Sequence, residues 1–262
     1  HLHWDHYHGA TLRKFQEINP TILFPKHFNK RMKEDLLKDF NFTKIKELNH
    51  GQKYKLSDNF LIASYQFNPI CIDSTLVVEA DGIKILNCND SKTFGFSLKQ
   101  IINNHPVIDF AFRSHSSASP IPHCIKNVDV EKTNRTPSNY ADDFIAFAKE
   151  TKSKYVIPFA SSHIYLHQLS KKFNKYYSHP SYIKNQFESK INVQQECKIM
   201  VSGSSWSKDK GFQIRNHDFT KLKSDIENYS DKYQHKINKQ LELEDKQILN
   251  KKLMLKMLMA LK

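Results

Sequence analysis

The chain has 262 residues, of which 39% are hydrophobic and 12% aromatic, enough for one or two domains with a buried core. It has no apolar stretch of the ~20 residues needed to cross a bilayer. Its four cysteines include no Cys-x-x-Cys pair, which argues against a disulfide scaffold and a cysteine-based zinc knuckle. We therefore expect a protein of a reduced, cytoplasmic compartment.

The formal net charge is +13, from 40 Lys and Arg against 27 Asp and Glu. Such an excess can indicate an anionic partner. Lysine greatly outnumbers arginine, and Asn, Ile and Lys are all abundant, as AT-rich coding bias produces. We therefore do not favour nucleic-acid binding as the main function, whereas a small anionic substrate is compatible with the charge.

The first six residues, His1-Leu2-His3-Trp4-Asp5-His6, contain three imidazoles and a carboxylate. Imidazole nitrogen and carboxylate oxygen both suit zinc, iron and similar ions, so this spacing can supply ligands to two adjacent metals. The alternative is a histidine-rich surface stretch or the remnant of a tag. Tags repeat histidine without an interposed Asp, so the run favours a metal site.

The first half of the chain then alternates between helical and strand patterns. We expect a helix over 10–18, a strand over 21–24, a helix over 30–40 and strands within 53–65. Residues 75–80 and 83–86 flank Asp81-Gly82, which is a strong hairpin signal. The second of these strands leads to Asp90, which is either a turn residue or a site residue.

In the second half, we expect a helix ending at 104, a strand over 107–112, a helix over 138–151, and strands that start at 155 and 197. The polar loop that follows the strand predicted over 107–112 contains Arg113, His115 and His123. Because such loops commonly line sites, His115 is a candidate substrate contact, and Arg113 and His123 are weaker candidates for holding an anion.

This arrangement resembles the metallo-β-lactamase superfamily, and the His-x-His-x-Asp-His run carries the resemblance. The family implies an α/β fold, the four-layer αββα sandwich, in which strands precede this loop. We therefore expect the N-terminal part of the domain to be missing. The metallo-β-lactamase-like domain is predicted to span 1–216, followed by a lysine-rich helical extension over 217–262. The apolar end of that extension, 253–261, is expected to pack on the domain or against a partner helix.

The resemblance also implies a site of one or two divalent ions, zinc in the first place, with iron or manganese as alternatives. The implied ligands are His1, His3, Asp5, His6, Asp90 and His163, with Asp5 also orienting the attacking water. In the family the last metal ligand along the chain is a histidine, and His167 is the alternative to His163 for that position. A family histidine before the hairpin is absent from 64–69, where Gln66 or Asn68 is the available replacement.

A narrower similarity covers about 1–212, and it depends on Pro158-Phe159-Ala160-Ser161 with the later His167 and Phe173-Asn174, and on the 116–122 loop. Here the chain is similar to the metallo-β-lactamase-like part of CMP-N-acetylneuraminate hydroxylases. These enzymes also use a Rieske domain, and the paired Cys and His ligands of such a domain are not found in this sequence.

We therefore predict a metal-dependent hydrolase of an ester, lactone, amide or phosphoester, with sugars or sugar nucleotides as candidate substrates. The alternatives are a hydroxylase-like protein that needs a separate Rieske domain and a non-catalytic binding protein with the same fold.

Overall fold

The computed structural model describes residues 6–27, 30–66, 73–91, 93–116, 129–160, 163–191 and 194–246. The chain forms two compact units. The first comprises 1–162 and 176–215, and the second comprises 163–175 and 216–262. The second unit thus combines all of the predicted C-terminal extension with a short segment from the middle of the chain.

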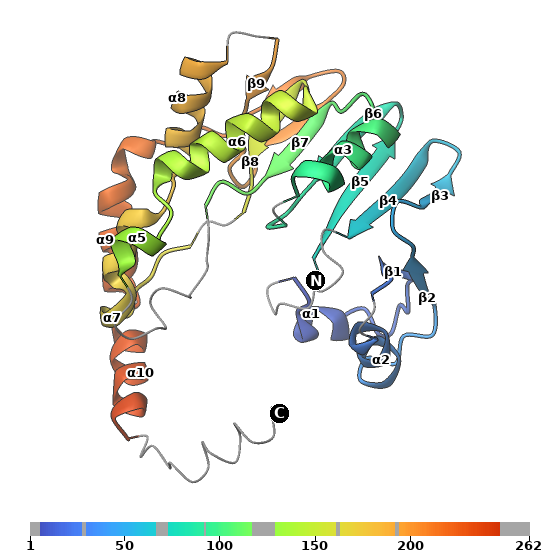
Figure 1. Cartoon of the computed structure of the whole chain (residues 1–262). Helices are drawn as coiled ribbons and strands as arrows, with labels where there is room; N and C mark the ends of the chain where they lie inside the picture. The colour runs from blue at the N-terminus through green and yellow to red at the C-terminus, as the bar shows by residue number, and fades with distance from the viewer. Residues whose placement is uncertain are drawn as a thin grey trace. The chain divides into compact units, whose positions relative to one another are not determined.

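A seven-stranded mixed sheet forms the centre of the first unit, with strand order β3-β4-β5-β6-β7-β8-β9 (Figure 1). Neighbours from β3 to β6 are antiparallel, whereas those from β6 to β9 are parallel. The strands are β3 (Lys53–Ser57), β4 (Phe60–Gln66), β5 (Ser74–Ala80), β6 (Ile83–Asn87), β7 (Phe110–Arg113), β8 (Tyr155–Pro158) and β9 (Glu196–Cys197). Together with its covering helices, this sheet confirms the predicted α/β fold.

The predicted hairpin is present as β5 and β6. Asp81 and Gly82 form its turn with φ of 49° and 77°, the positive values that a tight hairpin turn requires. Ala80 pairs with Ile83 on either side of the turn. This register places Val77 opposite Leu86, and both side chains are fully buried on the same face of the sheet.

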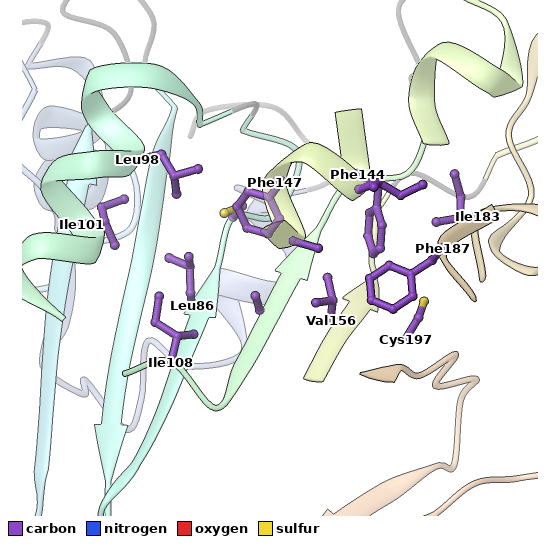
Figure 2. Close-up of a cluster of buried hydrophobic side chains, with 14 of the residues drawn as sticks. Leu86, Leu98, Ile101, Ile108, Phe144, Phe147, Val156, Ile183, Phe187 and Cys197 are labelled. Atoms are coloured by element: carbon purple, nitrogen blue, oxygen red, sulfur yellow. The ribbon is translucent and has the colours of Figure 1, made fainter. Parts of the chain in front are cut away.

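Three helices cover that face, as Figures 1 and 2 show: α3 (Gly95–Asn104), α6 (Pro137–Thr151) and α8 (Pro180–Lys190). A capping box at Thr136 and Asn139 begins α6, and Pro137 occupies its first turn. The buried core is continuous under the helices and includes Leu98 and Ile101 from α3, Phe144 and Phe147 from α6, and Ile183 and Phe187 from α8. The short helix α5 (Val130–Thr133) precedes α6.

A smaller α/β segment precedes the large sheet. It contains α1 (Gly9–Arg13), β1 (Ile22–Pro25), α2 (Arg31–Lys38) and β2 (Ile45–Leu48), with β1 and β2 paired in parallel. Its core is formed by Phe24, Met32, Leu36, Phe40 and Phe42. The first helix is shorter than predicted because turns replace it after Arg13, and β2 was not predicted.

Two other predicted strands differ from the structure. The strand expected over 107–112 begins only at Phe110, and the carboxylate of Asp109 accepts a hydrogen bond from Lys84 N just before it. The last strand of the sheet stops at Cys197. An unpredicted hairpin follows, formed by β10 (Ser205–Ser207) and β11 (Gly211–Gln213), and Trp206 packs edge-on against Phe110.

The second unit is helical in its described part. Its elements are α7 (Gln168–Lys171), the 3-10 helix η1 (Lys172–Tyr176) that runs into the first unit, η2 (Phe219–Lys221), α9 (Leu222–Lys232) and α10 (Gln234–Lys246). The helical pattern predicted from Asp218 onward is therefore confirmed up to Lys246, and the apolar stretch 253–261 lies outside the described residues. No described helix has the length and apolar character to span a membrane.

Candidate metal centre

Asp90 lies in a tight turn directly after β6. Asn89 has a positive φ of 41° and donates from its side-chain amide to Ser74 O at 3.0 Å. Its backbone N donates to Asn87 Oδ1 at 2.9 Å, and its own Oδ1 accepts from Ser91 N at 3.1 Å. Asparagine tolerates this left-handed conformation and closes such turns through its side chain. These bonds fix the direction in which the chain presents Asp90.

Arg113 holds the same loop from the neighbouring strand β7. Its Nη1 donates to Ser91 O at 3.3 Å and to Thr93 O at 3.0 Å, and its guanidinium lies over the Phe147 ring at 5.0 Å. Burial lowers the pKa of Arg113. In the structure the guanidinium binds the loop that carries Asp90, which gives Arg113 a positioning role, and its binding of an anionic ligand stays a prediction.

Asp90 lies close to His6. The His6 Nε2 to Asp90 Oδ2 distance is 3.5 Å, and both side chains are about one-third exposed, at 29% and 33%. These two residues are far apart in sequence, and both belong to the predicted ligand set. The fold therefore brings one imidazole nitrogen and one carboxylate oxygen of that set together.

The rest of the opening run, His1, His3 and Asp5, lies outside the described residues, as do Asn68 and His123. Within the described ranges, no three His, Cys, Asp or Glu side chains cluster closely enough to hold a metal ion. Gln66, the other possible replacement for the missing histidine, has its Oε1 2.8 Å from His50 Nδ1. Its amide nitrogen donates to Lys26 O at 3.4 Å.

The two candidates for the late ligand, His163 and His167, both lie in the second unit. The His163 ring contacts Tyr165 edge-on, with centroids 4.7 Å apart. His167 Nε2 lies 3.0 Å from Glu244 Oε2 in α10, so this imidazole has a carboxylate partner within its own unit. The choice between the two histidines stays a prediction.

His115, the predicted substrate contact, follows β7 and is only 1% exposed. Its backbone N donates to Ala160 O at 2.9 Å, and Ala160 itself adopts a positive φ of 48°. Burial and the nearby His179 lower the pKa of His115 to about 4. The imidazole is therefore neutral at physiological pH, and its ring contacts Tyr177 with centroids 6.1 Å apart.

Sequence reasoning missed several buried polar residues. His27, just after β1, is buried, and its Nε2 has no hydrogen-bond partner among the described residues. Ser178 is fully buried and precedes His179, whose Nδ1 accepts from Ser181 N at the start of α8. A histidine followed by proline is a readable helix-start signal, since proline favours the first helical position. The sequence carries no comparable signal for His27.

Comparison with protein-family models gives no match, and comparison with curated protein sequences gives none either. Among solved structures, the chain is similar to the metallo-beta-lactamase fold protein YhfI from Bacillus subtilis, with 13% identity and a TM-score of 0.49 over 79% of this chain and 75% of that one. It is similar to a candidate metal-dependent hydrolase from Parabacteroides distasonis, with 13% identity and a TM-score of 0.45 over 76% and 72%. It is also similar to the short form of human tRNase Z, with 15% identity and a TM-score of 0.40 over 62% and 70%.

Proposed function

We propose that this chain is a metal-dependent hydrolase of the metallo-β-lactamase type, acting on an ester, lactone, amide or phosphoester of a small anionic molecule. Sugar nucleotides are one candidate substrate class. The proposed ligands of a first ion are His1, His3 and His163, and those of a second are Asp5, His6 and Asp90. Zinc is the first candidate metal, and iron and manganese are the alternatives.

The observation that carries this proposal is the distance between His6 and Asp90. Imidazole and carboxylate ligands bind zinc at about 2.0–2.1 Å, so two ligands of one tetrahedral ion stand about 3.4 Å apart. A charge-assisted hydrogen bond between them would be shorter, at about 2.7–2.9 Å. The observed 3.5 Å matches the separation of two ligands on one ion. The donor set, neutral nitrogen and anionic oxygen, also suits such an ion.

A divalent ion bound between these residues would supply a water whose pKa falls toward ~7 and would polarise the scissile group. The residues of the chain have separate tasks around it. Asp5 is proposed to orient the water. Asn89 and Arg113 keep the Asp90 loop rigid, because one locks the turn from within and the other binds Ser91 O and Thr93 O from β7. Rigid presentation of the ligand limits the reorganisation that binding requires.

Metal content of the purified full chain tests the proposal. The wild type is compared with His6→Ala and Asp90→Asn, and with the matched controls His235→Ala and Asp58→Asn, which replace exposed residues of the same types. We expect bound metal in the wild type and in both controls, and reduced metal in the two site variants. Hydrolysis of lactones, phosphodiesters and nucleotide sugars is then assayed with added zinc, manganese or iron.

Two results would contradict the proposal. The first is a wild-type protein that binds none of these metals after reconstitution. The second is turnover that survives in both Asp90→Asn and His6→Ala at the wild-type rate. Metal binding without turnover of any substrate class would point instead to a binding protein with the same fold.

A further inference from the structure

Three buried polar atoms lie near the carboxyl end of β7 without a hydrogen-bond partner among the described residues. They are Nδ1 and Nε2 of His115 and Oγ of Ser178. His115 is 1% exposed and Ser178 is 0% exposed. Native proteins pair almost all such groups, and each unpaired one costs about 1–3 kcal/mol. Three such atoms close together indicate that a bound ligand supplies their hydrogen bonds.

The three atoms belong to one local cluster. Ser178 N donates to Ser116 Oγ at 3.2 Å, which ties the segment before α8 to the residue next to His115. The His115 ring contacts Tyr177, and the Tyr177 ring contacts His179 at 6.3 Å. Two chain segments far apart in sequence therefore meet here.

The cluster adjoins the N-terminus of α8, an 11-residue helix. His179 is the N-cap residue, and Ser178 immediately precedes it. In the first turn of α8, Pro180 has no N–H and Ser181 N already donates to His179 Nδ1, so this helix end favours an anion mainly through the positive end of its dipole. The positive helix end and the unpaired side chains therefore both favour a negatively charged ligand.

The available donors fit an oxyanion. A neutral imidazole offers one N–H, and the Ser178 hydroxyl offers one O–H. Residues 176–187 contain no Asp or Glu, nor do residues 114–116, so neither segment supplies a carboxylate of its own to compete. The cluster can therefore donate hydrogen bonds to an anion without like-charge repulsion from these segments.

The cluster lies beside the proposed metal centre in the sheet. β6 and β7 are parallel neighbours, and Asn87 pairs with Phe112. Asp90 and His115 each follow three residues after that pair, Asp90 in the turn beyond β6 and His115 just beyond the end of β7. In α/β sheets, ligands bind at the carboxyl ends of such strands. Both residues therefore follow the strand ends at which a substrate of this fold class would bind.

We infer that His115, Ser178 and the N-terminus of α8 form an oxyanion pocket that binds the phosphate or carboxylate group of the substrate hydrolysed at the His6–Asp90 centre. This inference rests on the proposed function for the identity of the reaction. Binding of the oxyanion itself does not require the metal, so the two are tested separately.

The experiment measures binding of inorganic phosphate, and separately of acetate, to the full chain treated with a chelator, in 0.15 M NaCl. Isothermal titration and the ligand-induced rise in melting temperature are the readouts. Ser178→Ala and His115→Asn are compared with the wild type. Ser189→Ala, an exposed serine at the far end of α8, and His235→Asn, an exposed histidine, are the controls.

We expect saturable binding in the wild type and both controls. Loss of one hydrogen bond to a charged ligand should weaken binding about 10-fold or more in Ser178→Ala and in His115→Asn. Without ligand, Ser178→Ala should melt at the wild-type temperature or above, because it removes a buried hydroxyl that has no protein partner. The stronger of the two ligands identifies the substrate's anionic group.

The inference is overturned if neither phosphate nor acetate binds the wild type saturably, or if Ser178→Ala binds both as the wild type does. Because alanine is nearly isosteric with serine, this variant decides the question even if His115→Asn does not fold. Oxyanion binding that persists in a protein without hydrolase activity would remove the proposed function and leave the pocket.

Discussion

Replacing His105 by alanine is expected to lower the free energy of unfolding by about 3–5 kcal/mol. His105 is fully buried between α3 and the sheet, with its Nδ1 2.6 Å from Glu79 Oε1 and its Nε2 3.0 Å from Tyr65 Oη. Tyr65 Oη in turn accepts from Asn104 Nδ2 at 3.1 Å. A neutral His105 satisfies this chain if Nδ1–H donates to Glu79 and Nε2 accepts from Tyr65.

The magnitude is the sum of three contributions. The bond to the Glu79 carboxylate is worth about 1.5–3 kcal/mol and the neutral bond to Tyr65 about 0.5–1.5 kcal/mol, with a further cost for the cavity. Glu79 is 18% exposed, so water can partly replace the first bond, which favours the lower half of the range. Tyr65→Phe, which removes one hydroxyl, should cost about 1–3 kcal/mol.

Urea unfolding of the wild type, the two single variants and the double variant measures these values. Because both residues share one bond, we expect a coupling energy of about 1–2 kcal/mol. The reasoning is refuted if His105→Ala costs less than 1 kcal/mol or if the two single effects are additive.

His105 should also make the free energy of unfolding decrease as the pH falls. Burial lowers the pKa of His105, against the opposing effect of Glu79, so the unfolded chain binds a proton at this residue before the folded chain does. The stability that neutral His105 provides is therefore complete above pH ~6.5 and is lost as the pH falls below that value. In the alanine variant, this part of the pH dependence should be absent.

Three further predictions concern other buried groups. The pKa of His115 is lowered from 6.5 to about 4, so its contribution to stability is present above pH ~6.5 and about 3 kcal/mol of it is lost by pH ~4; His115→Asn should flatten the unfolding profile in that range, and an unchanged profile would contradict the assignment. Burial raises the thiol pKa of Cys88 to about 11 and of Cys197 to about 12, so alkylation followed by peptide mass spectrometry should leave both unmodified until the protein unfolds. Thr136→Ala removes the capping box of α6 and should cost about 1 kcal/mol in urea unfolding, whereas Thr136→Ser should cost less.

The sequence predicted the elements that are marked by residues within them, such as turn glycines and helix-start prolines. The structure contains the Asp81-Gly82 turn between two apolar strands, and the helix predicted over 138–151 is present as α6, which begins at Pro137. By contrast, β2 is a four-residue strand, Ile-Lys-Glu-Leu, and is defined by its parallel pairing with β1. No local pattern separates such a segment from a loop.

In the candidate site, too, some features were predicted from the sequence and others were not. Asp90 was predicted as a ligand because it follows a strong hairpin in the order that the resemblance implies, and the structure places it 3.5 Å from His6, another predicted ligand. The bonds from Arg113 to this loop were not predicted, because its partners are the backbone carbonyls of Ser91 and Thr93, which carry no sequence signal. The position of Ser178 depends on where α8 docks. Contacts made by the backbone or by helix docking appear only in three dimensions.

The mixed topology of the large sheet has a consequence for the order in which the protein folds. From β3 to β6, each strand pairs with the next along the chain, so these contacts are local and form early. Strands β7, β8 and β9 join only after long connections through α3, α6 and α8 have closed. The Asp90 turn therefore forms with the early hairpin, but Arg113 reaches it only when β7 docks. We expect a folding intermediate that carries Asp90 on a loose loop, and we expect the proposed metal centre to become rigid only late in folding.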